Sequence, residues 1–226
     1  MLRFVTGEPA LLLKNRILVI ADLHIGIEKE YREAGLFLPD QTSFLAKKLE
    51  KLVRKTKAKK IIVLGDLKHR IPGLGPKEER DIPEFCKKFK IELIPGNHDG
   101  GLKDLQIKIH SVKGLLIGDV FLCHGHAWPG EDVNKAKTLV IAHTHPQIEF
   151  TDSLGHRWLE PVWIRARTRK CRKLKSIDLI VMPAFNQFAG GTAVNRSWLL
   201  GPVSKLVKEV RAYLLDGTDL GSFRKT

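Results

Sequence analysis

Cysteine is scarce in this 226-residue chain: only Cys86, Cys123 and Cys171 are present, and no two of them form a C-x-x-C pair. A small, odd number of widely spaced cysteines excludes a disulfide framework and argues against a zinc site built from thiolates. It is typical of proteins that remain in a reducing compartment. We therefore expect the protein to be cytoplasmic.

Long apolar runs are also lacking. The longest uninterrupted apolar stretches, such as "ILVIA" and "IIVL", are the size of a β-strand, well below the roughly 18 residues that a membrane span needs. The N-terminus has no charged segment followed by a long apolar core and a small-residue cleavage site, so we expect no secretion signal. There is no repeat, low-complexity tract or linker. These absences predict no membrane partner and a single domain over residues 1–226.

Acidic residues are outnumbered: 25 Asp and Glu stand against 39 Lys and Arg, a net charge of +14. Two runs hold much of the excess, with eight basic residues in 47–60 and seven in 165–175. A basic surface attracts polyanions, so DNA or RNA is a candidate partner. A solvated, lysine-rich exterior explains the same charge equally well.

What is present is an alternation of strand and helix patterns. Apolar β-rich runs at 16–22, 60–66 and 91–96 predict strands. Between them, helical spacing of apolar residues predicts a helix from the N-cap Asp40 to Lys57, a loop at 70–80 and a short helix at 82–89. The second half has β periodicity, at 107–112, 114–119, 120–125, 138–143, 147–152, 161–166 and 177–185. The pattern predicts an α/β (α+β) protein with packed sheets and helices outside.

Five of these predicted strands end in similar polar blocks. Seven of the nine histidines lie in them, and the blocks read "DLH", "GDLKH", "GNHD", "HGH" and "AHTH". Strand ends that converge on one edge of a sheet are where α/β proteins place their sites. In extended chain, residues i and i+2 point to the same face, so Asp22 with His24, and His143 with His145, can face one pocket.

The chemistry of the blocks favours metal binding. Imidazole, carboxylate and amide ligands without thiolates suit first-row divalent metals such as Mn, Fe, Co, Ni or Zn. Seven such ligands are too many for one tetrahedral site and fit two ions that share a bridge. Two divalent cations leave a net positive centre, which suits an anionic substrate such as a phosphate ester. Each block alone could equally be ordinary turn chemistry or a core histidine; only the series of five points to a site.

In this order, the five blocks resemble those of the calcineurin-like metallophosphoesterases, over residues 21–145. With His69 in its second block, the chain resembles the branch of SbcD-type repair nucleases and their small archaeal and bacterial relatives. The later segments "PAFNQFAGGTAVN" and "YLLDGTDLGSF" also look similar to those small phosphoesterases. The resemblance implies a four-layer αββα sandwich, the metallophosphoesterase fold.

The resemblance also implies a site with two divalent metal ions, Mn²⁺ first and Fe, Ni, Co or Zn as alternatives. One ion would be held by Asp22, His24 and His145, and the other by Asn97, His124 and His143, with Asp66 bridging them. A metal-bridging hydroxide would attack phosphorus. His98 would protonate the leaving oxygen, with Asp99 orienting it, and both would be catalytic. His69 and His126 would contact the phosphate of the substrate.

The predicted function is therefore a metal-dependent phosphoric ester hydrolase acting on phosphate mono- or diesters, with nucleic acid as a candidate substrate. Two alternatives stay open. One is a small-molecule phosphodiesterase with no role on nucleic acid. The other is a non-catalytic binding module on the same scaffold, although such modules usually lose ligands and all seven are present here. The sequence does not indicate the oligomeric state.

Overall fold

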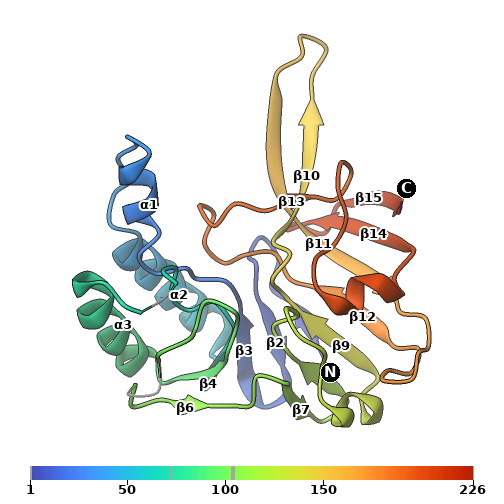
Figure 1. The fold of residues 1–226 in the computed structure, drawn as a ribbon, viewed down its shortest axis with the longest axis horizontal. Helices are drawn as coiled ribbons and strands as arrows, with labels where there is room; N and C mark the ends of the chain where they lie inside the picture. Colours follow the sequence, from blue (N-terminus) through green and yellow to red (C-terminus); the bar gives the residue numbers. More distant parts are fainter. Residues whose placement is uncertain (1, 72, 103–104, 226) are drawn as a thin grey trace.

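In the computed structural model, which describes residues 2–71, 73–102 and 105–225, two β-sheets pack face to face (Figure 1). The first sheet has the order β1-β2-β3-β4-β5-β6, and β3 to β6 run parallel. Its strands are β1 (Arg3–Phe4), β2 (Leu11–Leu13), β3 (Ile17–Ile20), β4 (Lys60–Leu64), β5 (Ile91–Ile94) and β6 (Lys108–Ile109). Helices α2 (Gln41–Thr56) and α3 (Pro76–Phe89) cover its outer face.

The second sheet has the order β13-β10-β11-β12-β9-β8-β7, with β14 paired to β11 and β15 to β14. Strands β8, β9 and β12 run parallel. The bounds are β7 (Leu115–Ile117), β8 (Val120–Leu122), β9 (Thr138–Ile141), β10 (Pro146–Thr151), β11 (Arg157–Arg167), β12 (Asp178–Val181), β13 (Thr192–Ala193), β14 (Glu209–Leu214) and β15 (Asp219–Arg224). The hairpin of β10 and the first part of β11 projects from the body of the molecule (Figure 1).

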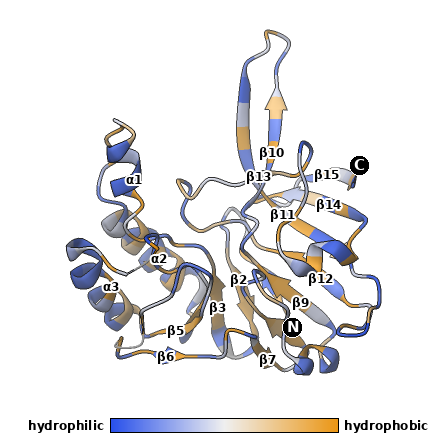
Figure 2. Cartoon of the chain, in the orientation of Figure 1, coloured by the Kyte–Doolittle hydropathy of each residue, from blue (hydrophilic) through white to orange (hydrophobic). Residues whose placement is uncertain are grey.

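The pleat of the strands sorts apolar side chains into separate cores. In β3, Leu18 and Ile20 pack with the helices, whereas Val19 packs in the core between the two sheets. A third core, which includes Leu139 and Ile141 of β9, lies on the outer face of the second sheet. The hydropathy colouring follows this order, with the strands at the centre mostly hydrophobic (Figure 2). Both faces of these strands are buried, which is why they read as continuous apolar runs.

The long helix forms as its sequence predicts. Asp40 is the N-cap of α2 and its side chain accepts a hydrogen bond from the Ser43 N–H (3.3 Å). Leu45, Leu49 and Leu52 face the first sheet, at the spacing of one helix face.

Helix α3 begins earlier than predicted. Residues 70–80 read as a loop because of their glycines and prolines, but the helix starts at Pro76. Gly75 is its N-cap, and the Glu78 side chain accepts a hydrogen bond from the Gly75 N–H. Proline suits the first helical turn, where its missing N–H has no partner to lose. The short helix α1 (Glu28–Glu33) was not predicted at all.

The predicted fold class is confirmed, with one difference in the fourth layer. The outer face of the second sheet is covered by loops and two 3₁₀ helices, Glu131–Lys135 and Pro202–Leu206, rather than by α-helices. Short segments suffice there because each contributes only one or two apolar side chains, such as Val133 and Val203. Within the part of the chain that the structure describes, no helix has the length and apolar character needed to span a bilayer.

Candidate metal centre

The five polar blocks follow the carboxyl ends of β3, β4 and β5 in the first sheet and of β8 and β9 in the second. Within each sheet these strands run parallel, so their carboxyl ends share an edge. The edges of the two sheets meet, and side chains from different blocks come within a few ångströms of one another. Parallel pairing and sheet packing together place the site.

The backbone of the blocks is strained. φ is positive, between 44° and 66°, at Asp22, His24, Asp66, His143 and His145. Each such residue costs of order 1–3 kcal/mol and persists only where its surroundings hold it. Neighbouring blocks hold each other here: the Asp22 N–H donates to the Gly65 carbonyl (3.1 Å) and the His24 N–H to the Asp66 carbonyl (2.9 Å). Strain gathered at these strand ends indicates a functional site rather than ordinary turns.

A first cluster combines side chains of three blocks. Its members are Asp22, His24, Asp66 and His145, whose ligand atoms all lie within 4.8 Å of one another. His145 Nε2 is 3.3 Å from Asp22 Oδ1, and His24 Nε2 is 3.7 Å from Asp66 Oδ2. A group of this size can hold one cation.

A second cluster consists of Asp66, His124 and His143, again within 4.8 Å. His124 Nε2 lies 3.3 Å from Asp66 Oδ2 and 3.2 Å from Asn97 Oδ1, so the Asn97 amide oxygen adjoins this cluster. Asp66 belongs to both clusters. The structure thus brings together all seven residues that the resemblance names as ligands, in two groups that share one carboxylate.

The Asp22 carboxylate fits a site that holds a cation. Asp22 is 0% exposed, and neither of its carboxylate oxygens has a hydrogen-bond partner among the described residues. A buried ionised carboxylate without hydrogen bonds is costly unless it is paired with positive charge or coordinates a metal. The surrounding donors are imidazoles, a second carboxylate and an amide oxygen, a set that suits divalent transition metals.

The pKa values of the site keep two of its histidines neutral and one of its carboxylates charged. Burial lowers the pKa of His24 to about 3 and that of His143 to about 4. Burial also acts to lower the pKa of His124, but its hydrogen bond to Asp66 and the charges of Asp22 and Asp66 outweigh burial and raise it to about 9. Burial acts to raise the pKa of Asp66, yet His124 holds that pKa well below its usual range. Asp66 therefore stays anionic.

Two of the histidines have their second ring nitrogen held by backbone. His124 Nδ1–H donates to the Leu64 carbonyl (2.9 Å), and His145 Nδ1–H donates to the Ala189 carbonyl (3.3 Å). In the neutral imidazole that binds a metal, these bonds leave the Nε2 lone pair facing the clusters. Metal-ligating histidines are typically oriented in this way by a partner on the other nitrogen.

Comparison with known sequences assigns the family. The sequence profile of the calcineurin-like phosphoesterases matches residues 15–182, a span that includes all five blocks. This chain belongs to the calcineurin-like phosphoesterase family. It is therefore a hydrolase of phosphate esters. No curated protein sequence matches it.

One solved structure has a fold similar to that of this phosphoesterase, and a second is more distantly similar. The nuclease MPE of Pseudomonas putida has a TM-score of 0.59 and 22% identity, over 97% of this chain and 99% of that one. The phosphoesterase YfcE of E. coli has a TM-score of 0.46 and 16% identity, over 93% of this chain and 99% of that one. The likeness to the nuclease supports the two-sheet fold of this chain and does not by itself assign a substrate.

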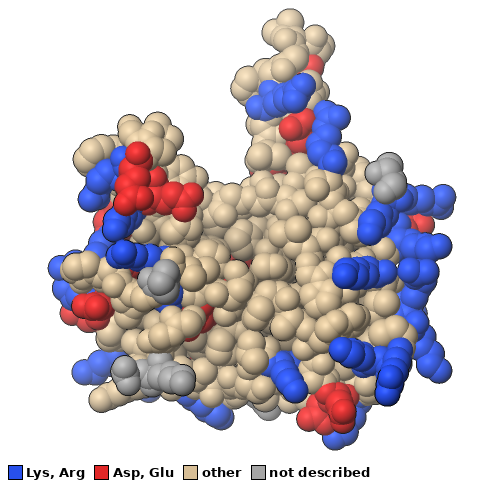
Figure 3. All heavy atoms as spheres, in the orientation of Figure 1, with Lys and Arg blue, Asp and Glu red and all other residues tan. Residues whose placement is uncertain are grey.

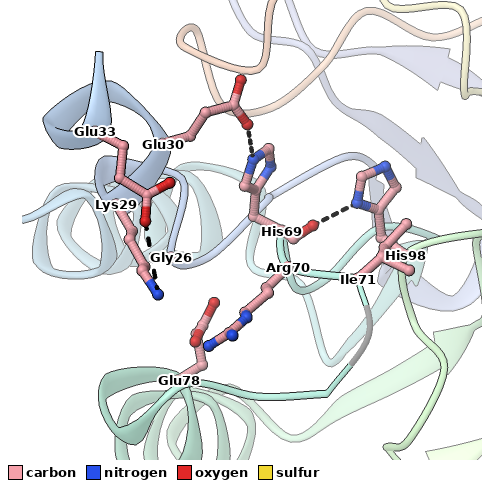
Figure 4. Close-up of a pocket in the computed structure, with 9 residues that line it drawn as sticks. All are labelled: Gly26, Lys29, Glu30, Glu33, His69, Arg70, Ile71, Glu78 and His98. Atoms are coloured by element: carbon pink, nitrogen blue, oxygen red, sulfur yellow. Dashed lines mark hydrogen bonds and ion pairs between the residues drawn. The ribbon is translucent and has the colours of Figure 1, made fainter.

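His98 of the phosphoesterase lies at the rim of the site, 24% exposed, with Nε2 3.9 Å from Asp66 Oδ2. Its backbone N–H donates to Asp66 Oδ1 (3.0 Å) and its Nδ1–H donates to the His69 carbonyl. Figure 4 shows His98 and His69 side by side in a pocket of about 410 Å³, whose wall also includes Arg70 and Glu30. The free Nε2 of His98 thus borders a space that opens to solvent.

Asp99 does not orient His98, contrary to expectation. Its carboxylate accepts hydrogen bonds from the backbone N–H groups of Leu67 (2.9 Å) and Gly96 (2.8 Å). It therefore joins the loop of the second block to that of the third, and the His69 carbonyl takes the place beside His98. Gly96 is required at this junction because a Cβ there would collide with Asp66.

The two histidines expected to contact phosphate differ in their surroundings. Both ring nitrogens of His69 are already engaged: Nδ1 lies 3.2 Å from His24 Nδ1, and Nε2 lies 2.5 Å from Glu30 Oε2. His126 lies near His124 and His143, with ring centroids 5.2 Å and 6.1 Å away in tilted and edge-on arrangements, and its Nδ1 has no partner among the described residues. His126 therefore stays a candidate for phosphate contact, whereas His69 is committed to protein groups.

Sequence reasoning missed Asn186, which follows β12 in the run "PAFNQFAGG". The side chain is almost fully buried; its Nδ2 donates to the Leu23 carbonyl (2.8 Å) and its Oδ1 accepts from the Phe188 N–H (3.0 Å). Leu23 lies between the strained residues Asp22 and His24, so Asn186 supports the backbone of the first block. No spacing in the sequence links the two segments; only their meeting in the fold reveals the contact.

The two basic runs lie largely away from the site. Arg167 pairs in register with Asp178, which pairs with Thr138 at the start of β9, whereas His143 follows the end of β9. Residues 57–60 likewise lead into the start of β4, at the end opposite Asp66. In Figure 3, Lys and Arg side chains gather at the margins of the visible face, away from its centre. Of the two basic runs that make DNA or RNA a candidate partner, residues 165–175 thus do not adjoin the clusters.

The contact from Asn186 predicts that Asn186→Ala lowers the affinity for Mn²⁺. Asn195→Ala is a matched control, because Asn195 makes the same two kinds of bond to the Glu149 N–H (3.1 Å) and carbonyl (2.8 Å) in the projecting hairpin. Each substitution should reduce the free energy of unfolding by about 1–3 kcal/mol, measured by urea denaturation. Only Asn186→Ala should weaken Mn²⁺ binding in calorimetric titration. Equal Mn²⁺ affinity in the two variants would limit Asn186 to a purely structural role.

Proposed function

We propose that this phosphoesterase binds two divalent metal ions per chain and hydrolyses phosphodiesters. The observation that carries the proposal is the position of Asp66, whose carboxylate belongs to both clusters of candidate ligands. Divalent cations bound there would supply Lewis acidity: they would lower the pKa of water so that hydroxide can attack phosphorus, and they would neutralise negative charge on the ester.

The residues divide into three roles in this proposal. Six ligands flank the shared Asp66, in one set of Asp22, His24 and His145 and another of Asn97, His124 and His143. His98, at the rim of the site with Nε2 3.9 Å from the shared Asp66 carboxylate, holds on Nε2 the proton that passes to the leaving oxygen. His126, with a buried nitrogen that lacks a partner, binds a phosphate oxygen. Mn²⁺ is the first metal to test.

Nucleic acid is the proposed substrate class, with a small phosphodiester as the alternative. The net charge of +14 favours a polyanion, and the solved structure with the similar fold is described as a nuclease. His69 in the second block supports a place in the SbcD-related branch. Against these points, residues 57–60 and 165–175 do not border the clusters, although Lys48 of the first run lines a pocket with His145.

Asp66→Asn tests the shared carboxylate. An amide retains the size of the side chain but removes the negative charge that two cations would share, so both metal content and activity should fall. Elemental analysis after reconstitution with Mn²⁺ should find close to two ions in the wild type and fewer in the variant. Full activity with both metals retained in Asp66→Asn would show that the bridge is wrongly assigned. Two bound ions in the wild type without hydrolysis of any diester would favour the non-catalytic binding module.

His98→Ala tests the proton donor. The variant should keep its metal content and lose about 10²–10⁴-fold in kcat on esters with poor leaving groups, the usual contribution of general acid catalysis. A nitrophenyl diester should lose much less, because its leaving group is already stable as an anion. His110→Ala is the control, since His110 lies outside the site and pairs with Glu92 (2.7 Å). Equal losses on both kinds of ester would remove His98 from the role.

The substrate class is tested by DNA binding at two salt concentrations. For nucleic acid held through phosphate contacts, log K should fall with log salt at about 0.9 per duplex phosphate neutralised. The second run lies away from the clusters. Replacing four of its residues with glutamine should therefore leave both this slope and the turnover of a nitrophenyl diester nearly unchanged; the four are Arg165, Arg167, Arg169 and Lys170. Undetectable DNA binding at low salt, with normal diesterase activity, would leave a small-molecule phosphodiesterase.

A further inference from the structure

His24 differs from the candidate ligands His124 and His145 in what holds its second ring nitrogen. His124 and His145 donate Nδ1–H to backbone carbonyls, of Leu64 and Ala189. His24 Nδ1 instead faces a side chain, with His69 Nδ1 at 3.2 Å. His24 itself is almost fully buried, and its Nε2 faces Asp66 and His145. The orientation of this ring therefore depends on His69.

His69 is in turn held by a carboxylate from outside the five blocks. Its Nε2 lies 2.5 Å from Oε2 of Glu30, which is on α1, and Figure 4 shows the two side chains pointing toward each other. Helix α1 is fixed against the site by a second contact, because the Tyr31 hydroxyl donates to the Phe188 carbonyl (3.0 Å). The three side chains thus form a continuous line from α1 to the first cluster.

Only one arrangement of protons satisfies this line when His24 binds a metal. A neutral imidazole has one N–H, and a metal at Nε2 requires that the hydrogen sit on Nδ1. His24 Nδ1–H must then donate to a lone pair on His69 Nδ1. His69 consequently carries its hydrogen on Nε2, from which it donates to the Glu30 carboxylate. If the two histidines took the opposite tautomers, the His24 hydrogen would lie on Nε2, where the lone pair that binds the metal is needed.

We propose that Glu30 and His69 are positioning residues that fix the tautomer and orientation of His24 as a metal ligand. The proposal rests on the two-metal function proposed above and adds to it a carboxylate–histidine pair that touches neither metal nor substrate. It assigns His69 a role other than phosphate contact, because both of its ring nitrogens are engaged. It also gives α1, which no sequence pattern predicted, a function at the site.

The test measures Mn²⁺ affinity from the electron paramagnetic resonance signal of free Mn²⁺. Loss of such a partner typically costs about 10- to 100-fold in metal affinity. Glu30→Ala should fall near the lower end of this range, because the Glu30 side chain is 71% exposed. Glu30→Gln should recover most of the loss, since its amide oxygen still accepts the His69 hydrogen bond. His69→Leu should lose more than Glu30→Ala, and His69→Asn less than His69→Leu, since its amide oxygen can replace Nδ1.

Glu33→Ala is the matched control. Glu33 is on the same short helix and forms an exposed ion pair with Lys29 (3.8 Å), so its loss reports any general effect of altering α1. Mn²⁺ affinity in Glu33→Ala should equal that of the wild type. Circular dichroism of each variant should be unchanged, which separates loss of orientation from loss of fold.

Three outcomes would overturn the proposal. Unchanged Mn²⁺ affinity in both Glu30→Ala and His69→Leu would remove the positioning role. Unchanged Mn²⁺ affinity together with reduced diester turnover in His69→Leu would return His69 to phosphate contact. A third Mn²⁺ in the wild type, lost in His69→Leu, would make His69 a direct ligand together with His24 and His98, which also lie within 4.8 Å of one another. Fewer than two Mn²⁺ in the wild type would instead contradict the two-metal function itself.

Discussion

Two buried carboxylates, Asp22 and Asp66, impose the constraint on which the rest of the site depends. Both are 2% exposed or less, and Asp22 has no hydrogen-bond partner among the described residues. Burying an ionised carboxylate costs several kcal/mol even after the protein relaxes, so the fold must supply positive charge at this point. Against the effect of burial, the pair raises the pKa of His124 to about 9, whereas burial keeps His24 and His143 neutral, the form in which an imidazole can bind a cation.

Holding these groups in place takes more than the ligands themselves. The strand ends adopt left-handed backbone at five of the site residues, and that conformation is maintained by groups that contact no substrate. Asp99 joins two loops through backbone N–H groups, and Asn186 supports the backbone between Asp22 and His24. The two sheets therefore determine where the blocks lie, and buried polar side chains determine the local geometry of each block.

The charges of the second basic run lie farther from the metal clusters than electrostatic interactions extend in salt solution. A four-residue strand such as β9 spans roughly 13 Å, and Arg167 of the second basic run is level with its far end, in register with Asp178 and Thr138. The Debye length at physiological ionic strength is about 8 Å, so charges there are largely screened from an anion at the metals. Net charge alone therefore says little about which substrate reaches the centre, and the groups that line the pocket beside His98 matter more.

The sequence by itself determined the family, the segments that form β3 to β12, helix α2 and the seven candidate ligands, because each block follows a strongly apolar strand and its residue types carry their own chemistry. It did not predict the short or terminal strands β1, β2, β13, β14 and β15, nor the order of the strands in the two sheets. It could not determine contacts between segments distant in the chain. Asp99 bonds to the loop after β4 rather than to its neighbour His98, both ring nitrogens of His69 face His24 and Glu30 although the residue lines the pocket, and Asn186 reaches the loop after β3, 163 residues earlier. Periodicity reports which face of an element is buried, whereas these contacts depend on how two sheets and a short helix pack, and only the tertiary structure decides that.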